Sequence, residues 1–260
     1  MEEALAFSLV VGVSVGLSAG YLGSIMVLEK MALVGDALSH VALPGLALGL
    51  LLNFNPFFGA FAFLFTSAVV IWHLGRVTKL SFETLVGAVF TLALAIGILL
   101  VPEPDLLEAL FGDITKVGLF DAMTAAVVSV AVVFLIRLIY RRIVLGLISE
   151  ELAVSKGISI ARTNLLYLLL VSLTVAIGIK ITGTLLVGFL VVTPAAAARA
   201  ISSSLKRYVL LSSIFGAVSS TSGILLSNYF NVLPGPLVVL SGVTIFVVVV
   251  LVRWRLKLAP

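Results

Sequence analysis

An aspartate and a histidine, four residues apart, interrupt one of the most apolar parts of the sequence. Residues 31–48 read MALVGDALSHVALPGLAL and contain Asp36 and His40. Residues four apart on a helix lie on the same face, so the two side chains are expected to be neighbours. A carboxylate oxygen and an imidazole nitrogen suit divalent Zn, Mn, Fe or Co. The same pair is also able to relay protons through a membrane, and both readings are open at this point.

The pair also has a purely structural reading. Asp36 would cap the start of a helix, and His40 would form a hydrogen bond with a neighbouring helix. Pro44 and Gly45 follow directly and are expected to break or kink the helix, as Pro194 is expected to do in a later segment. Within a membrane, freed backbone groups are tolerated where they line a cavity or pack against protein. Paired ligands beside a broken helix therefore favour a transport path.

Composition places these residues in a membrane protein. Of the 260 residues, 62% are hydrophobic and only 11% are charged, which a soluble globule of this size does not accommodate. The basic residues are scattered between apolar blocks and form no basic stripe, so nucleic acid is not an expected partner, whereas membrane lipid is. The chain has no cysteine, which excludes thiolate metal sites and argues against Cu(I).

The apolar segments predict an all-α, polytopic helical bundle forming a single transmembrane domain over residues 1–260. About 20 helical residues are needed to cross the hydrocarbon core. We expect nine spans, at residues 5–28, 33–52, 56–74, 83–101, 119–140, 163–179, 184–199, 208–229 and 235–253. The seventh is short, so eight crossings with a re-entrant hairpin are an alternative.

The distribution of basic residues predicts the orientation of the chain. With nine spans, all Lys and Arg residues except Lys116 and Lys180 fall on one side. The positive-inside rule makes that side cytoplasmic, which places the N-terminus outside and the C-terminus in the cytoplasm. The acidic connection at residues 102–113 then falls on the outer side, in agreement with this orientation.

The loop predicted at about residues 141–162 contains a second spaced pattern. Glu151, Ala153 and Gly157 form an E-x-A-x-x-x-G spacing, with acidic residues suited to a helix start and glycine suited to its end. We expect a short helix parallel to the membrane. It is either an ordinary amphipathic linker or a surface that docks a cytosolic partner, and the spacing alone does not decide between them.

Motifs for nucleotide binding are absent from the sequence. It contains no G-x-x-x-x-G-K-[ST] phosphate loop, no H-E-x-x-H and no Gly-rich dinucleotide fingerprint, and the spacing G-x-S-x-G occurs only as GVSVG and GLSAG inside the first apolar span, not at a strand-to-helix turn. We therefore expect no enzymatic activity in this chain. If transport is driven by ATP, hydrolysis must take place on another polypeptide.

Five segments together resemble a known family. They are LEKMALVGDALSHVALPGLALG, FGDI, EELAVSKGI, VGFLVVTPAAAARA and LPGPLVVL. Their order and spacing resemble those of the membrane permeases of zinc, manganese and iron ABC importers, over nearly the whole chain. These permeases are similar to the transmembrane half of cobalamin and siderophore importers, without its first helix. Two positions depart from the family pattern: Glu29 and Lys30 replace a frequent basic pair, and Asn231 replaces a common aspartate.

The resemblance implies a homodimer in the cell membrane of a prokaryote, two cytosolic ABC ATPase subunits and an extracytoplasmic metal-binding protein. Asp36 and His40 would line the ion path, and Glu151, Ala153 and Gly157 would couple it to the ATPase. No permanent cofactor is implied: Zn or Mn is cargo, and ATP binds the partner. The expected function is the permease of an ATP-driven importer of divalent transition metals. The alternative is a secondary transporter that uses the Asp/His pair for proton coupling.

Overall fold

A computed structural model describes residues 2–78, 80–100, 110–113 and 117–258 of the chain, and within them it contains helices and no β-strand. Lys116 and most of the acidic connection, both used to predict the orientation, lie outside these ranges. The helices are α1 (Glu2–Leu28), α2 (Ala32–Val41), α3 (Leu43–Leu51), α4 (Pro56–Thr78), α5 (Phe82–Leu100), α7 (Leu119–Ile148), α8 (Glu150–Ser155), α9 (Ile160–Ile201), α10 (Leu205–Phe230) and α11 (Pro234–Leu258). The predicted all-α bundle is confirmed.

Helix α9 turns back on itself at Gly183. Gly183 has φ 70° and ψ 175°, which is not helical. A Cβ added to Gly178 would clash with Val187, so residues nine apart in sequence are in contact. Two helical segments pack side by side here, which we call α9a (residues 160–182) and α9b (residues 184–201). Glycine is required at the turn because its φ is positive and the backbone of Leu110 lies against its Cα.

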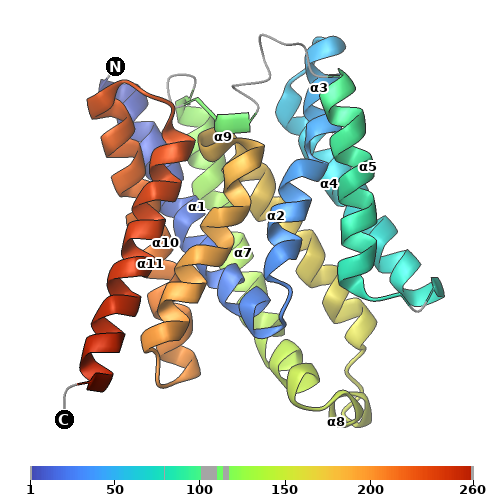
Figure 1. Cartoon of the computed structure of the whole chain (residues 1–260). Coiled ribbons are helices and arrows are strands. Elements are labelled where there is room, and N and C mark those ends of the chain that lie inside the picture. The colour runs from blue at the N-terminus through green and yellow to red at the C-terminus, as the bar shows by residue number, and fades with distance from the viewer. Residues whose placement is uncertain (1, 79, 101–109, 114–116, 259–260) are drawn as a thin grey trace.

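The reversal of α9 accounts for the number of crossings. By length and composition, eight helical segments within the described residues are able to cross a membrane, and Val187–Ile201 in α9b is a shorter apolar helix. Near its end, α9b packs Ala195 and Ala198 against Val27 and Leu28 at the end of α1. It therefore returns through the bundle, so with α9b counted the described residues make about nine passes, in agreement with the prediction. The two termini accordingly lie at opposite ends of the molecule (Figure 1).

Helices α1 and α10 are in close backbone contact. The backbones of Gly16 and Gly216 touch, and no side chain fits at either position. One turn further along, Gly20 lies against Ser212, whose hydroxyl donates a hydrogen bond to the Gly20 carbonyl. Small residues of this kind allow membrane helices to approach closely. In Figure 1 this pair lies with α11 on one side of the molecule, and α2 to α5 lie on the other.

Apolar side chains cover the outer faces of the peripheral helices. Leu99 on α5, Phe120 and Val130 on α7, and Leu240 on α11 are all exposed. An apolar surface distributed over several spans is suited to hydrocarbon rather than water. The expected contact with membrane lipid has this physical basis.

One predicted boundary is wrong. The fifth span was expected to end at residue 140, with a loop at 141–162, whereas α7 continues to Ile148. The arginines Arg141 and Arg142 mark the end of the apolar stretch, but arginine is a good helix former and does not end a helix. The connection to α9 is therefore shorter than predicted and consists mainly of α8.

Candidate functional site

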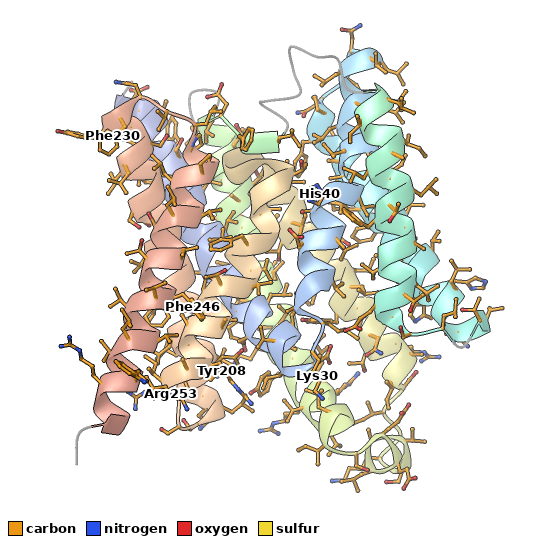
Figure 2. The ribbon with its side chains drawn as sticks, in the orientation of Figure 1. Lys30, His40, Tyr208, Phe230, Phe246 and Arg253 are labelled. Carbon is orange, nitrogen blue, oxygen red and sulfur yellow. The ribbon has the colours of Figure 1, made fainter. Side chains whose placement is uncertain are left out.

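Asp36 and His40 lie one turn apart on α2, as their spacing predicted. The side chain of Asp36 is exposed, whereas His40 is 8% exposed. Both belong to the membrane-spanning segment Val34–Leu51. Figure 2 shows His40 far along α2 from Lys30, which lies at the turn between α1 and α2. The pair is therefore well inside the bundle and not at its end.

The capping role for Asp36 is contradicted by the position of the helix start. Helix α2 begins at Ala32 with Met31 as its N-cap, and no side chain caps it. Asp36 comes a full turn later, beyond the backbone N–H groups that a cap satisfies. An exposed carboxylate within a membrane span is costly against lipid, so it is expected to face an aqueous cavity or another protein surface.

The backbone of α9b lies directly against Asp36. A Cβ added to Gly188 would come within 2.8 Å of Asp36 Oδ1 and within 2.9 Å of its Cβ. The absence of a side chain at Gly188 thus allows α9b to approach α2 at this carboxylate. Gly188 belongs to a segment that carried the family resemblance, but the sequence did not indicate which helix it would touch.

The ring of His40 packs against an aromatic ring. Its Nδ1 atom is buried and has no hydrogen-bond partner within the described residues. The ring of Phe90 on α5 lies against it, with 5.3 Å between ring centroids and 55° between ring planes. The structural reading, in which His40 bonds a neighbouring helix, is therefore not what the structure shows. No signal in the sequence connected Phe90 to this site.

A single chain offers an incomplete ligand set. The described residues contain no group of three or more His, Cys, Asp or Glu side chains that could hold a metal ion. Two donors from one helix turn leave most positions around a divalent cation open, unlike the closed four-ligand cage of a structural zinc site. Such an arrangement is suited to passing contact with an ion.

The helix interruption beside the pair lies at Ala42, between α2 and α3. Pro44 has no N–H, so the His40 carbonyl lacks its usual donor four residues later. Gly45 has a packing role as well: its backbone touches that of Gly59 on α4, leaving no room for a side chain at either position.

The break expected at Pro194 is found elsewhere. Pro194 lies inside α9b, and the only non-helical residue within α9 is Gly183. Proline is tolerated within membrane helices because neighbouring helices, side chains and water satisfy the backbone groups that it frees. The strained turn is placed at the glycine instead, because glycine alone adopts positive φ at little cost.

The segment from Glu151 to Gly157 forms the short helix that was expected. Helix α8 starts at Ser149, whose hydroxyl accepts a hydrogen bond from the Leu152 N–H. At its end, Gly157 has φ +73°, and the Ile158 N–H donates to the Ala153 carbonyl. This pattern is a Schellman C-cap. Figure 1 shows α8 at the end of the molecule opposite the N-terminus.

One feature of this segment needs correction. Ala153 and Gly157 were expected to form a smooth face for a partner, but Ala153 is 0% exposed and packs against its own chain. The exposed side chains of this segment include Glu151, Leu152 and Val154. Spacing correctly placed residues on the helix, but it did not tell which face the rest of the chain would cover.

A hydrogen bond joins α4 to the beginning of α9, close to α8. The Trp72 indole N–H donates to the Ala161 carbonyl at 2.7 Å, and the Arg76 guanidinium lies 5.0 Å from the Trp72 ring centroid. This contact connects the α3–α5 side of the bundle to the residues that follow α8. The sequence gave no indication of it.

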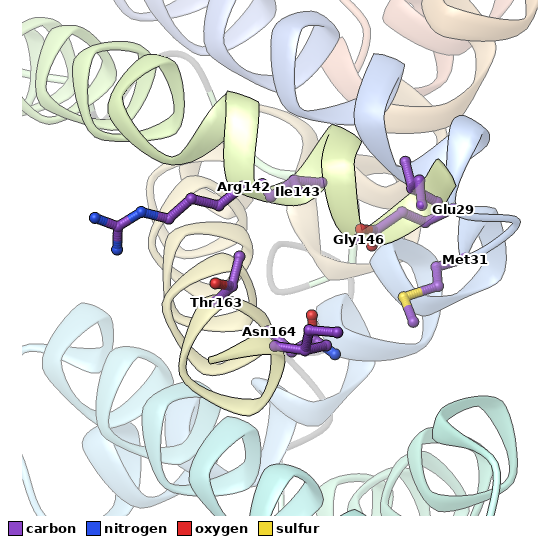
Figure 3. A pocket seen from close by; sticks show the side chains of 9 residues that line it. Glu29, Met31, Arg142, Ile143, Gly146, Thr163 and Asn164 are labelled. Carbon is purple, nitrogen blue, oxygen red and sulfur yellow. The ribbon is translucent and has the colours of Figure 1, made fainter. Parts of the chain in front are cut away.

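Glu29 lines a pocket of about 170 Å³ between the ends of α1, α7 and α9. Figure 3 shows its carboxylate on the same side of the pocket as Met31, with the Arg142 guanidinium pointing away. Within the described residues, no hydrogen bond or ion pair reaches this carboxylate. Burial raises the pKa of Glu29 from 4.5 to about 7.

Comparison with known proteins identifies the family. A model of the ABC 3 transport family matches residues 1–253. The chain belongs to that family. Its membership places it among the membrane-embedded subunits of ABC transporters.

Relatives with metal-related names match over almost their whole length. The manganese transport system membrane protein MntC of Listeria monocytogenes is 31% identical, over 92% of this chain and 87% of its own length. The high-affinity zinc uptake system membrane protein ZnuB of Haemophilus influenzae is 30% identical, over 98% of this chain and all of its own. These relatives give no support to the proton-coupled alternative.

Solved structures confirm the architecture. PsaBC from Streptococcus pneumoniae, solved in complex with Fab, has a chain 32% identical to this one, with a TM-score of 0.83, covering 95% of this chain and 90% of the other. An inward-facing metal-chelate type ABC transporter, described as putative, has a TM-score of 0.75 at 18% identity, over 95% and 84% of the two chains. The second likeness concerns the fold alone.

Proposed function

We propose that this chain is the permease of an ATP-driven importer for divalent transition-metal ions, with manganese or zinc as cargo. The observation that carries the proposal is the pair on α2: an exposed carboxylate and a buried imidazole without a hydrogen-bond partner, one turn apart within a membrane span. Polar groups in that position are costly unless they serve a path or a partner. The names of the relatives support the two metals.

The ion path is completed by a second copy of the chain. Asp36 is exposed beside the close contact between α2 and α9b, and a partner protomer facing it would remove the carboxylate from lipid. Two copies bring two aspartates and two histidines, which is enough for a divalent cation. A site assembled from two protomers also opens when they move apart, and this releases the ion.

Energy comes from a separate cytosolic ATPase that docks on α8. The exposed Leu152 and Val154 offer an apolar contact, and the two glutamates at the start of the helix lie beside it. The hydrogen bond from Trp72 on α4 to Ala161 on α9 then transmits a displacement of α8 and α9 to α4. An extracytoplasmic metal-binding protein delivers the ion at the other end. The N-terminus lies outside and the C-terminus in the cytoplasm of a prokaryotic cell.

The test is uptake of Mn²⁺ and Zn²⁺ by vesicles that contain the assembled complex, supplied with ATP and the binding protein. Asp36→Asn and His40→Gln are expected to abolish uptake while the complex still assembles. His73→Gln is the matched control, because His73 is the other histidine of the chain and lies near the end of α4. Normal uptake by both α2 variants would overturn the proposal. Uptake that requires a proton gradient while ATP is present would do so as well.

A further inference from the structure

The imidazole of His40 differs from most metal-binding histidines in what holds it. Such a histidine usually donates its second ring N–H to a carboxylate or a carbonyl, which fixes the ring and makes it a stronger ligand. Here Nδ1 is buried and meets no acceptor within the described part of the chain. The contact found instead is the aromatic ring of Phe90.

Helix α5 presents Phe90 from a fixed position. Phe90 and Gly97 are two turns apart, on one face of α5, and Ala93 lies buried between them. At Gly97 the helix touches the kink itself, because an added Cβ would come within 2.6 Å of Leu43 Cβ and 3.3 Å of Pro44 N. The same face of α5 therefore contacts both the kink and the His40 ring.

The opposite side of α5 takes no part in the protein core. Leu92 and Leu99 are 63% and 83% exposed, as expected for a helix at the lipid boundary. The inward face that includes Phe90, Ala93 and Gly97 thus makes the main contact between this helix and the α2–α3 segment. A peripheral helix with one narrow contact face is well placed to act on a single side chain.

We propose that Phe90 is a positioning residue that sets the orientation of the His40 imidazole toward the ion path. This inference rests on the proposed function and adds to it. With Nδ1 covered and Phe90 beside the ring, Nε2 is the nitrogen left to face a cation. An imidazole that packs against an aromatic ring is also a weaker metal ligand than one that donates its second N–H to a carboxylate. A weak ligand suits an ion that must leave again.

The experiment uses the complete complex in lipid vesicles and Mn²⁺ as the probe. Phe90→Leu and Phe90→Met remove the ring and keep an apolar side chain, whereas Phe90→Tyr keeps the ring. Phe61→Leu is the matched control, because Phe61 on α4 packs against Phe65, with 4.9 Å between the ring centroids. Each variant is measured for ATP-driven uptake and for the imidazole nitrogen signal of bound Mn²⁺ in pulsed electron paramagnetic resonance, read as the difference from His40→Gln.

The ring-removing variants are expected to lose about 10- to 100-fold in uptake, the range known for residues that orient metal ligands, together with the nitrogen signal. Phe90→Tyr and Phe61→Leu are expected to keep both. A nitrogen signal and uptake like wild type in either assembled ring-removing variant, with His40→Gln inactive, would overturn the role of Phe90. Loss of both by Phe90→Tyr in an intact complex would overturn it too. Active His40→Gln would instead overturn the proposed function.

Discussion

The Glu29 carboxylate is largely removed from water by the fold. Its pKa is raised from 4.5 to about 7 by burial. Between these two values the folded chain holds a proton that the unfolded chain has released, so stability is greatest below the window and falls as pH rises through it. The charged groups nearby are Lys30 on the same turn and Arg142 on α7, whose guanidinium points away (Figure 3).

Removal of this charge should therefore stabilise the protein at alkaline pH. We expect Glu29→Gln to raise the unfolding temperature relative to wild type more at about pH 8 than at about pH 5. Glu83→Gln, at an exposed carboxylate in the first turn of α5, serves as the control and should show no such change. Thermal unfolding of the purified chain at both pH values gives the answer. A constant difference between Glu29→Gln and wild type would contradict the burial of this group.

Gly188 controls the distance between two helices at the proposed ligand. An added methyl group would meet Asp36 Oδ1 at 2.8 Å, and overpacking of this kind costs about 1–3 kcal/mol. We expect Gly188→Ala to lower metal uptake because α9b must move away from Asp36. Gly87→Ala is the matched control, since nothing lies within 4 Å of a Cβ there. Equal uptake by both variants would show that the helix contact does not matter for transport.

At the scale of elements, α8 has one buried face and one exposed face. Ala153 is buried where α8 packs against the rest of the chain, so a bulky residue there would displace the whole helix. Val154 is 59% exposed, and its replacement is expected to change only what docks from outside. This distinction replaces the smooth face expected from spacing, and it makes Val154 the cleaner position for testing the coupling of transport to ATP.

We expect Val154→Asp to weaken retention of the ATPase subunit in a pull-down and to lower uptake. Its effect on unfolding should stay within about 0.5 kcal/mol, as is usual for surface changes. Val154→Thr, which keeps the shape of the side chain, should behave like wild type. If Val154→Asp retained the ATPase fully, α8 would be an ordinary linker and not the docking element.

The elements differ in how well local sequence predicts them. The lengths of the apolar segments placed most predicted spans within a few residues of the observed helices. The interruption near Pro44 follows from the missing N–H of proline. The turn at residues 180–183 was expected between the sixth and seventh spans, but the contact of Gly183 with the backbone of Leu110 was not, because Leu110 is distant in sequence. The same limit applies to Phe90: any of several aromatic residues on α4 and α5 was able to meet His40. Contacts of this kind are decided by packing between helices.

At the scale of the whole molecule, the two ends of the bundle are expected to face different compartments. The absence of cysteine allows single cysteines to be introduced without background. Val232 follows Phe230, which Figure 2 places at the end of the bundle where the N-terminus lies, and Ser155 is exposed at the end of α8. We expect Val232→Cys to react with an impermeant maleimide on intact cells, and Ser155→Cys to react only after permeabilisation. Reaction of both on intact cells would contradict nine crossings.

The short segment α9b has a consequence for biosynthesis. Residues 184–201 are about 27 Å long at 1.5 Å per residue, whereas the hydrocarbon core is about 30 Å thick. In the finished protein α9b is enclosed by α1 at Gly23, α2 at Asp36, α10 at Tyr208 and α11 at Gly242. The last two helices emerge from the ribosome after it. Until they arrive, this segment lacks two of the helices that cover it in the finished protein. Stable insertion of the middle of the chain thus depends on synthesis of its end.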